Sequence, residues 1–266
     1  MVTHQDVRRS YVTIKQEVES LAAGFLELGL EPGDRIGIWG PNNHEWYLTQ
    51  FAAAKAGLIL VNINPAYQPE ELRYCLNKVG VKALVAADSF KTQNYYELLT
   101  SIAPEILSSS AGAIQCPDIP SLKTVIMMSR VEQAGTFRFG EVLSNPSPGL
   151  VERVEGLTHR IQMDQAANIQ FTSGTTGKPK GVTLSHHNLV NNAYNIGVRM
   201  GYHLEVSITI TTSRPLYSLS SLTESVSPSL SITASVTSVP PSEVSSTAPR
   251  PSSPAPALTG RPVWRP

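Results

Sequence analysis

The residues best suited to chemistry in this chain lie in one short stretch, from Thr172 to Gly181. Hydroxyl side chains and successive backbone N–H groups can donate hydrogen bonds to an anion. Gly174, Gly177 and Gly181 can adopt positive φ angles and approach a ligand closely, because they lack Cβ. Two lysines add positive charge. The sequence therefore predicts a polyphosphate-binding loop, whose candidate residues are Thr172, Ser173, Gly174, Thr175, Thr176, Gly177, Lys178, Pro179 and Lys180.

The alternative interpretation is a solvated glycine-rich loop, but the order of residues 171–181 favours a phosphate site. The pattern differs from the common P-loop, in which G-x-x-x-x-G-K-[ST] opens a helix. Here Gly174 and Gly177 are three positions apart, and proline follows Lys178. Strand-like residues at 168–171 and 182–184 predict that the loop joins two strands, which argues against a kinase or GTPase site.

The elements expected to position this loop alternate between helices and strands over about the first 200 residues. Helical patterns cover residues 14–26, 44–56, 69–78 and 94–106, and a glycine follows each of the first three. Strand-like runs occupy residues 35–39, 58–63, 83–87 and 122–128. Because helices separate the strands, the sequence predicts an α/β fold with a mostly parallel sheet and flanking helices.

The loop and its flanks resemble the phosphate-binding loop of the adenylate-forming superfamily, which includes acyl-CoA synthetases, luciferases and peptide-synthetase adenylation domains. In that family a serine caps the helix after the loop, as Ser185 would here. Other segments resemble acyl-CoA synthetases in their expected order, and most of all the mitochondrial medium-chain acyl-CoA ligases. These segments are residues 33–38, 41–42, 62–67, 79–85 and 90–96.

The resemblance implies two half-reactions. A fatty carboxylate attacks the α-phosphorus of ATP to give acyl-adenylate and pyrophosphate, and the coenzyme A thiol then takes the acyl group and releases AMP. The expected cofactors are therefore ATP and Mg²⁺, with coenzyme A as co-substrate. By the same resemblance the loop would grip the β- and γ-phosphates, and Lys180 would neutralise the leaving pyrophosphate. Lys178 lies where relatives vary, so a surface role is an equal alternative.

The composition changes near Glu205. Ser, Thr and Pro supply more than half of the residues that follow, and such a stretch buries little apolar surface. We therefore expect the N-terminal part of an adenylate-forming domain at 1–205 and a disordered, low-complexity tail at 206–266, with a stray strand conceivable at 207–211. A secreted stalk and a regulatory tail are alternatives, but a splice variant or shifted reading frame is favoured, because the resemblance stops at the same point.

The expected function is ATP-dependent activation of a medium-chain fatty acid to acyl-CoA. The later motifs of the family are not found, so we expect a truncated chain that is inactive alone, with no catalytic residue and no metal ligand of its own. The alternative is a non-catalytic fragment that binds a nucleotide or a partner. A different phosphotransferase would need a second acid/base or metal cluster, which this sequence lacks.

Charge and composition limit the partners. The chain has 21 basic and 21 acidic residues, so no net field favours nucleic acid, and no apolar run is long enough to span a membrane. The expected partners are the fatty acid, ATP and coenzyme A, with chaperone association if the sheet is cut partway. No targeting peptide is visible, so a cytoplasmic location stands beside the mitochondrial one that the resemblance implies.

Overall fold

A seven-stranded sheet lies at the centre of the part of the chain described here by a computed structural model, which covers residues 2–4, 7–144, 146–172, 179–201, 207–210 and 234–237. Its strands follow the order β11-β10-β4-β3-β5-β8-β9, and every neighbouring pair is parallel except β10 with β11. The strands are β3 (Arg35–Trp39), β4 (Ile59–Ile63), β5 (Val81–Ala86), β8 (Thr124–Met127), β9 (Phe137–Arg138), β10 (Ala166–Thr172) and β11 (Lys180–Ser185).

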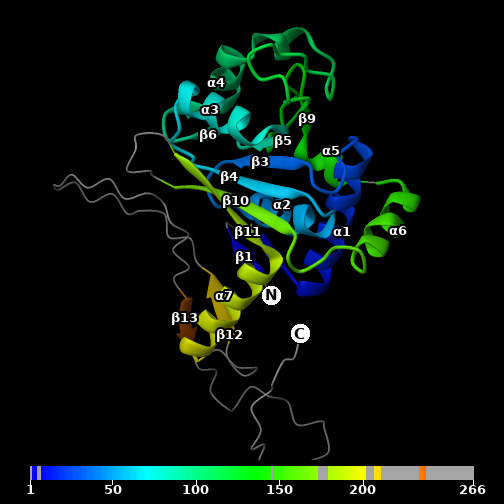
Figure 1. Cartoon of the computed structure of the whole chain (residues 1–266), viewed down its shortest axis with the longest axis vertical. Helices are drawn as coiled ribbons and strands as arrows, with labels where there is room; N and C mark the ends of the chain where they lie inside the picture. Colours follow the sequence, from blue (N-terminus) through cyan, green and yellow to red (C-terminus); the bar gives the residue numbers. More distant parts are fainter. Residues whose placement is uncertain are drawn as a thin grey trace, which may run out of the picture.

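Helices cover both faces of this sheet (Figure 1). One face carries α1 (Tyr11–Glu27), α2 (His44–Lys55), α5 (Phe139–Leu143) and α6 (Pro148–Leu157). The opposite face carries α3 (Pro69–Val79), α4 (Tyr95–Ile102) and a 3₁₀ turn at Pro104–Ser108. The helix α7 (His186–Arg199) follows β11 directly. Short hairpins are formed by β1 (Val2–His4) with β2 (Val7–Arg9), β6 (Ser89–Phe90) with β7 (Gln93–Asn94), and β12 (Ser207–Ile210) with β13 (Ala234–Thr237).

The core is divided by the sheet into two apolar layers, because successive side chains of a strand point to opposite faces. Ile36 and Ile38 of β3 pack with α1 and α2. Trp39, the next residue along, packs on the other face and stacks on Tyr95 of α4, with ring centroids 3.6 Å apart. Strands buried on both faces are typical of parallel sheets.

The predicted α/β fold with a mostly parallel sheet is confirmed. One predicted helix is divided: residues 94–106 form α4 and then the 3₁₀ turn, because Pro104 has no N–H to continue an α-helix and its ring clashes with the preceding turn. The helices α5 and α6 were not predicted. The strand conceivable at 207–211 is present as β12, whereas most of the expected disordered tail lies outside the described residues. Within those residues, no helix combines the length and hydropathy needed to cross a membrane.

Candidate phosphate-binding site

The candidate loop leaves the sheet at the carboxyl end of β10 and returns as β11. β10 runs parallel to the inner strand β4, with Ile169 opposite Val61, so its direction is fixed by the core of the sheet. β11 pairs antiparallel with β10, and their last pair is Thr172 opposite Lys180. The predicted strand–loop–strand arrangement is therefore confirmed. In open α/β sheets, ligands bind beyond the carboxyl ends of the parallel strands, which is where this loop starts.

Three of the nine candidate residues belong to the described part of the loop. Thr172 and Lys180 are exposed and face each other across the hairpin, while Pro179 is half-buried. The other six candidates, Ser173, Gly174, Thr175, Thr176, Gly177 and Lys178, lie outside the described residues. The structure thus brings together a hydroxyl and an ammonium group at the two ends of the loop, and both have room to contact a ligand.

Gly181 has a different role from the one expected. It is not among the described glycines with positive φ, so the predicted turn conformation is wrong at this position. Instead it lies in β11, where a Cβ would sit 3.2 Å from Ile169 Cγ2 and 3.7 Å from Val79 Cγ1. Because Gly181 has no side chain, β11 can approach β10 and the end of α3 closely. Close approach of backbone segments is a role of glycine separate from its freedom to adopt positive φ.

Tyr74 of α3 also contacts this end of the loop, and it was not predicted as a site residue. Its hydroxyl donates a hydrogen bond to the Pro179 carbonyl oxygen over 3.3 Å. The two residues are 105 positions apart, so no local pattern could have revealed the contact. The half-buried ring belongs to a helix whose Leu72, Cys75 and Leu76 are buried in the core.

The helix after the loop begins as predicted. The Ser185 hydroxyl accepts a hydrogen bond from the Asn188 N–H over 3.2 Å, which satisfies one of the free N–H groups of the first turn. His186 is the first helical residue, and burial lowers the pKa of its imidazole. His187 lies 3.4 Å from the Asp164 carboxylate. The two histidines thus lie in the first turn of α7.

The helix α7 presents an apolar surface to solvent. None of its residues is buried, and its exposed apolar side chains include Val190, Tyr194 and Val198. The neighbouring strand β11 is the edge of the sheet. Exposed apolar residues beside an open edge favour association with other chains, which is the physical basis of the expected chaperone association; that association stays a prediction.

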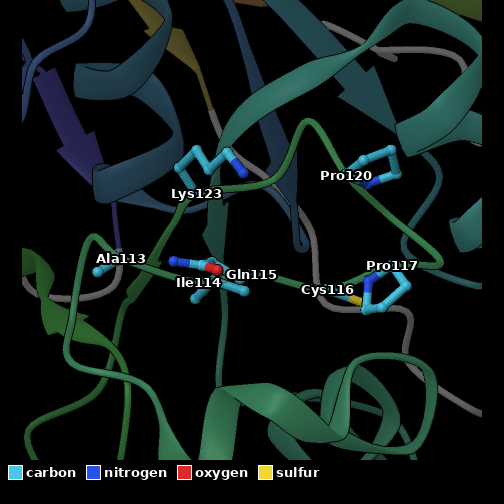
Figure 2. Close-up of a pocket in the computed structure, with 7 residues that line it drawn as sticks. All are labelled: Ala113, Ile114, Gln115, Cys116, Pro117, Pro120 and Lys123. Carbon is cyan, nitrogen blue, oxygen red and sulfur yellow. The ribbon is translucent and has the colours of Figure 1, made fainter.

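The cysteines and pockets of the described residues offer few reactive or charged groups. Both cysteines are buried and free, and burial raises the pKa of the Cys75 thiol to about 12, so it stays protonated at neutral pH. A shallow pocket of about 490 Å³ lies along the segment before β8 (Figure 2). Its lining residues are Ala113, Ile114, Gln115, Cys116, Pro117, Pro120 and Lys123, and only the last is charged. No group of three or more His, Cys, Asp or Glu in the described residues could hold a metal ion.

Known proteins resemble most of this chain. The model of the family described as "AMP-binding enzyme" matches residues 1–249. The chain is 46% identical over 218 residues to a protein of Danio rerio named medium-chain acyl-CoA ligase ACSF2, mitochondrial, covering 82% of this chain and 36% of that protein. It is also 46% identical over 204 residues to the Homo sapiens protein of that name, covering 76% and 33%. The chain therefore spans about a third of the length of these curated relatives.

Solved structures show the same fold. The anthranilate CoA ligase AuaEII, in complex with anthranoyl-AMP, superimposes with a TM-score of 0.58 at 20% identity, covering 74% of this chain and 33% of that one. A long-chain-fatty-acid-CoA ligase (FadD1) from Archaeoglobus fulgidus gives 0.56 at 22% identity, covering 75% and 36%. The confident alignment of such distant sequences indicates that the sheet and its helices have the architecture of these ligases.

Proposed function

This chain belongs to the AMP-binding enzyme family, and from that premise we propose that residues 172–180 bind the phosphates of ATP. The binding would serve the activation of a medium-chain fatty acid to acyl-adenylate and then to acyl-CoA. The observation that carries the proposal is the position of the loop, which starts at the carboxyl end of β10 and ends at Lys180, directly across the hairpin from Thr172. The relatives named medium-chain acyl-CoA ligases support the substrate class.

The chemical difficulty of the first step is electrostatic. The fatty carboxylate is an anion that must attack the polyanionic triphosphate, while further negative charge develops on the departing pyrophosphate. Preorganised donors aimed at that charge lower the barrier, because they need little rearrangement as the charge develops. Lys180 is suited to this task, since it carries a compact ammonium group on an exposed position at the loop's end.

The remaining loop residues would share the binding. Thr172 would donate its hydroxyl to a phosphate oxygen from the other side of the hairpin, and Ser173, Thr175 and Thr176 would add hydroxyl donors with the glycine amides. We assign the stronger phosphate contact to Lys180 and a weaker, solvated one to Lys178. Magnesium is typical of ATP chemistry, but the described residues offer no carboxylate cluster for it, so we assign it no protein ligand. Coenzyme A would be the acyl acceptor.

Two lysine variants test the site, because they remove the same charge from either side of Pro179. Calorimetric titration of the full chain with ATP and Mg²⁺ should show binding, and Lys180→Ala should weaken it about tenfold or more, the usual size of a lost charge-assisted contact. Lys178→Ala should change the affinity less than about threefold, since a solvated charge contributes less than about 1 kcal/mol. Absence of binding at millimolar ATP, or equal effects of the two variants, would refute the assignment.

A second assay separates the reaction from simple binding. Full chain incubated with ATP, Mg²⁺, octanoate and coenzyme A would form octanoyl-CoA if it is a complete ligase. Binding of ATP without octanoyl-CoA would favour the nucleotide-binding alternative and the predicted inactivity of the chain alone. The relatives' names also lead us to propose a mitochondrial location, which fractionation of cells producing the chain would test against a cytoplasmic one.

A further inference from the structure

The helix α3 is firmly fixed beside the candidate loop. Its last carbonyl, that of Val79, accepts a hydrogen bond from Arg35 Nε over 2.8 Å, which attaches the helix end to the central strand β3. The Asn77 side chain donates to the Asp118 carbonyl over 2.7 Å. Together with the buried Leu72 and Leu76, these contacts hold α3 against the sheet. A side chain on α3 can therefore hold other groups in place.

Two contacts connect α3 to the point where the loop ends. The Tyr74 hydroxyl donates to the Pro179 carbonyl over 3.3 Å. Two residues later, the absence of a side chain at Gly181 lets β11 lie against Val79. Because a peptide unit is planar and trans, a carbonyl held towards α3 also fixes the direction of the following N–H, that of Lys180. The Lys180 backbone is thus oriented from α3 as well as from β10.

Among the described strands, β11 pairs with β10 alone. It is at the edge of the sheet, its first four residues are exposed, and the helix that follows it has no buried residue. Stability is not uniform across a fold, and segments with few buried contacts open at low free-energy cost. A single hydrogen bond from a fixed helix should therefore strongly affect the position of this end of the loop.

We propose that Tyr74 is a positioning residue that fixes the Pro179–Lys180 peptide and thereby directs Lys180 towards the bound phosphates. The role for ATP rests on the function proposed above, whereas the fixing of the peptide does not. Tyr74 itself does not need to touch the nucleotide. Removing its hydroxyl should loosen the end of the loop and leave the buried residues of α3, Leu72, Cys75 and Leu76, unchanged.

Limited proteolysis of the full chain measures this loosening without any ligand. Trypsin cleaves after Lys180, because glycine follows it, but not readily after Lys178, because proline follows it. Peptide mass spectrometry can compare the initial rate at Lys180 with that at the exposed Lys91, which lies elsewhere in the fold. Tyr96→Phe is the matched control: the Tyr96 hydroxyl donates to the Ala134 carbonyl over 3.0 Å, an equivalent bond far along the chain from the loop.

The Tyr74→Phe variant should be cleaved about fivefold faster at Lys180, the effect of one hydrogen bond of ordinary strength when cleavage follows local opening. Cleavage at Lys91 and the urea midpoint should not change, and Tyr96→Phe should behave as wild type at Lys180. Unchanged cleavage at Lys180, or equal acceleration at both sites, would overturn the proposal.

ATP titration of the same variants then tests the consequence for binding. If the wild-type chain binds ATP, Tyr74→Phe should weaken the affinity about threefold to fivefold and Tyr96→Phe should not. Equal affinities would show that Tyr74 does not direct Lys180 towards the nucleotide. If the wild-type chain does not bind ATP but Tyr74→Phe is cleaved faster at Lys180, the phosphate site is refuted and the structural role of Tyr74 stands.

Discussion

Gly24 is the position where the smallest substitution should have the largest effect on stability. It lies in α1 and is buried against α5. A Cβ added there would be 2.1 Å from the Val142 carbonyl oxygen and 3.0 Å from Val142 Cγ1. Non-bonded carbon and oxygen atoms do not approach so closely, and the oxygen belongs to backbone, so it cannot rotate away. In Gly24→Ala, α1 and α5 must move apart.

The expected change in unfolding free energy is the difference of two terms. Replacing glycine by alanine inside a helix stabilises it by about 0.5–1 kcal/mol, mainly because the unfolded chain becomes less flexible. Overpacking a close-packed interface costs about 1–3 kcal/mol, and a backbone contact of this kind belongs at the upper end or beyond. Gly24→Ala should therefore destabilise the chain by about 2 kcal/mol.

Gly156→Ala is the matched control, because Gly156 lies in the neighbouring helix α6 and a Cβ there would have nothing within 4 Å. Gly156→Ala gains the higher helix propensity of alanine without a steric clash, so it should stabilise the chain by about 0.5 kcal/mol or more. Urea denaturation followed by circular dichroism measures both variants. If Gly24→Ala were as stable as wild type, or if the two substitutions shifted the midpoint in the same direction, the close packing of α1 on α5 would be wrong.

Two further predictions concern single side chains. Burial lowers the pKa of the folded-state His186 below its ordinary value of 6.5, so on acidification the unfolded chain binds the proton before the folded chain does. The contribution of neutral His186 to the free energy of unfolding should therefore be fully present above pH 6.5 and be lost as the pH falls through the folded pKa. His186→Gln should reduce this loss in urea titrations at a series of pH values, and an unchanged pH profile would contradict the assignment. The Tyr95 hydroxyl donates to the Pro65 carbonyl over 2.6 Å, so Tyr95→Phe should cost about 1–3 kcal/mol by leaving that carbonyl unpaired. The Trp39 stack needs only the ring, so tryptophan fluorescence should be retained, and a variant as stable as wild type would refute the role of the hydroxyl.

Much of the fold could be predicted because local signals mark the ends of its elements. Gly29, Gly57 and Gly80 all adopt the positive φ that ends a helix or starts a turn, and glycine is the residue that does so at least cost. The strand β3 has the predicted bounds. The helices α5 and α6 were missed because residues 139–157 carry only short apolar patterns, and their packing against α1 is a long-range contact.

The sequence predicted which residues form the candidate loop, but not the contacts that hold the loop in place. Residue types revealed Thr172 and Lys180 as ligand-binding candidates, and the flanking strands were predicted from their apolar residues. The role of Gly181 was misjudged, because the sequence shows that a glycine is flexible but not that a strand must pass close to Ile169. Tyr74 could not be found from sequence at all, since its contact depends on α3 packing beside β11.

The two ends of the loop are held by very different parts of the molecule. Thr172 ends a strand that pairs with β4 in the middle of the sheet and buries Ile169 in the core. Lys180 begins an edge strand that, among the described strands, pairs with β10 alone and is contacted from α3. A ligand held between a fixed and a weakly restrained end gains affinity when the second end is preorganised, because less order has to be imposed on binding. Tyr74 contacts that weakly restrained end. Tyr74→Phe should therefore lower the affinity for ATP although the Tyr74 hydroxyl does not need to touch the nucleotide.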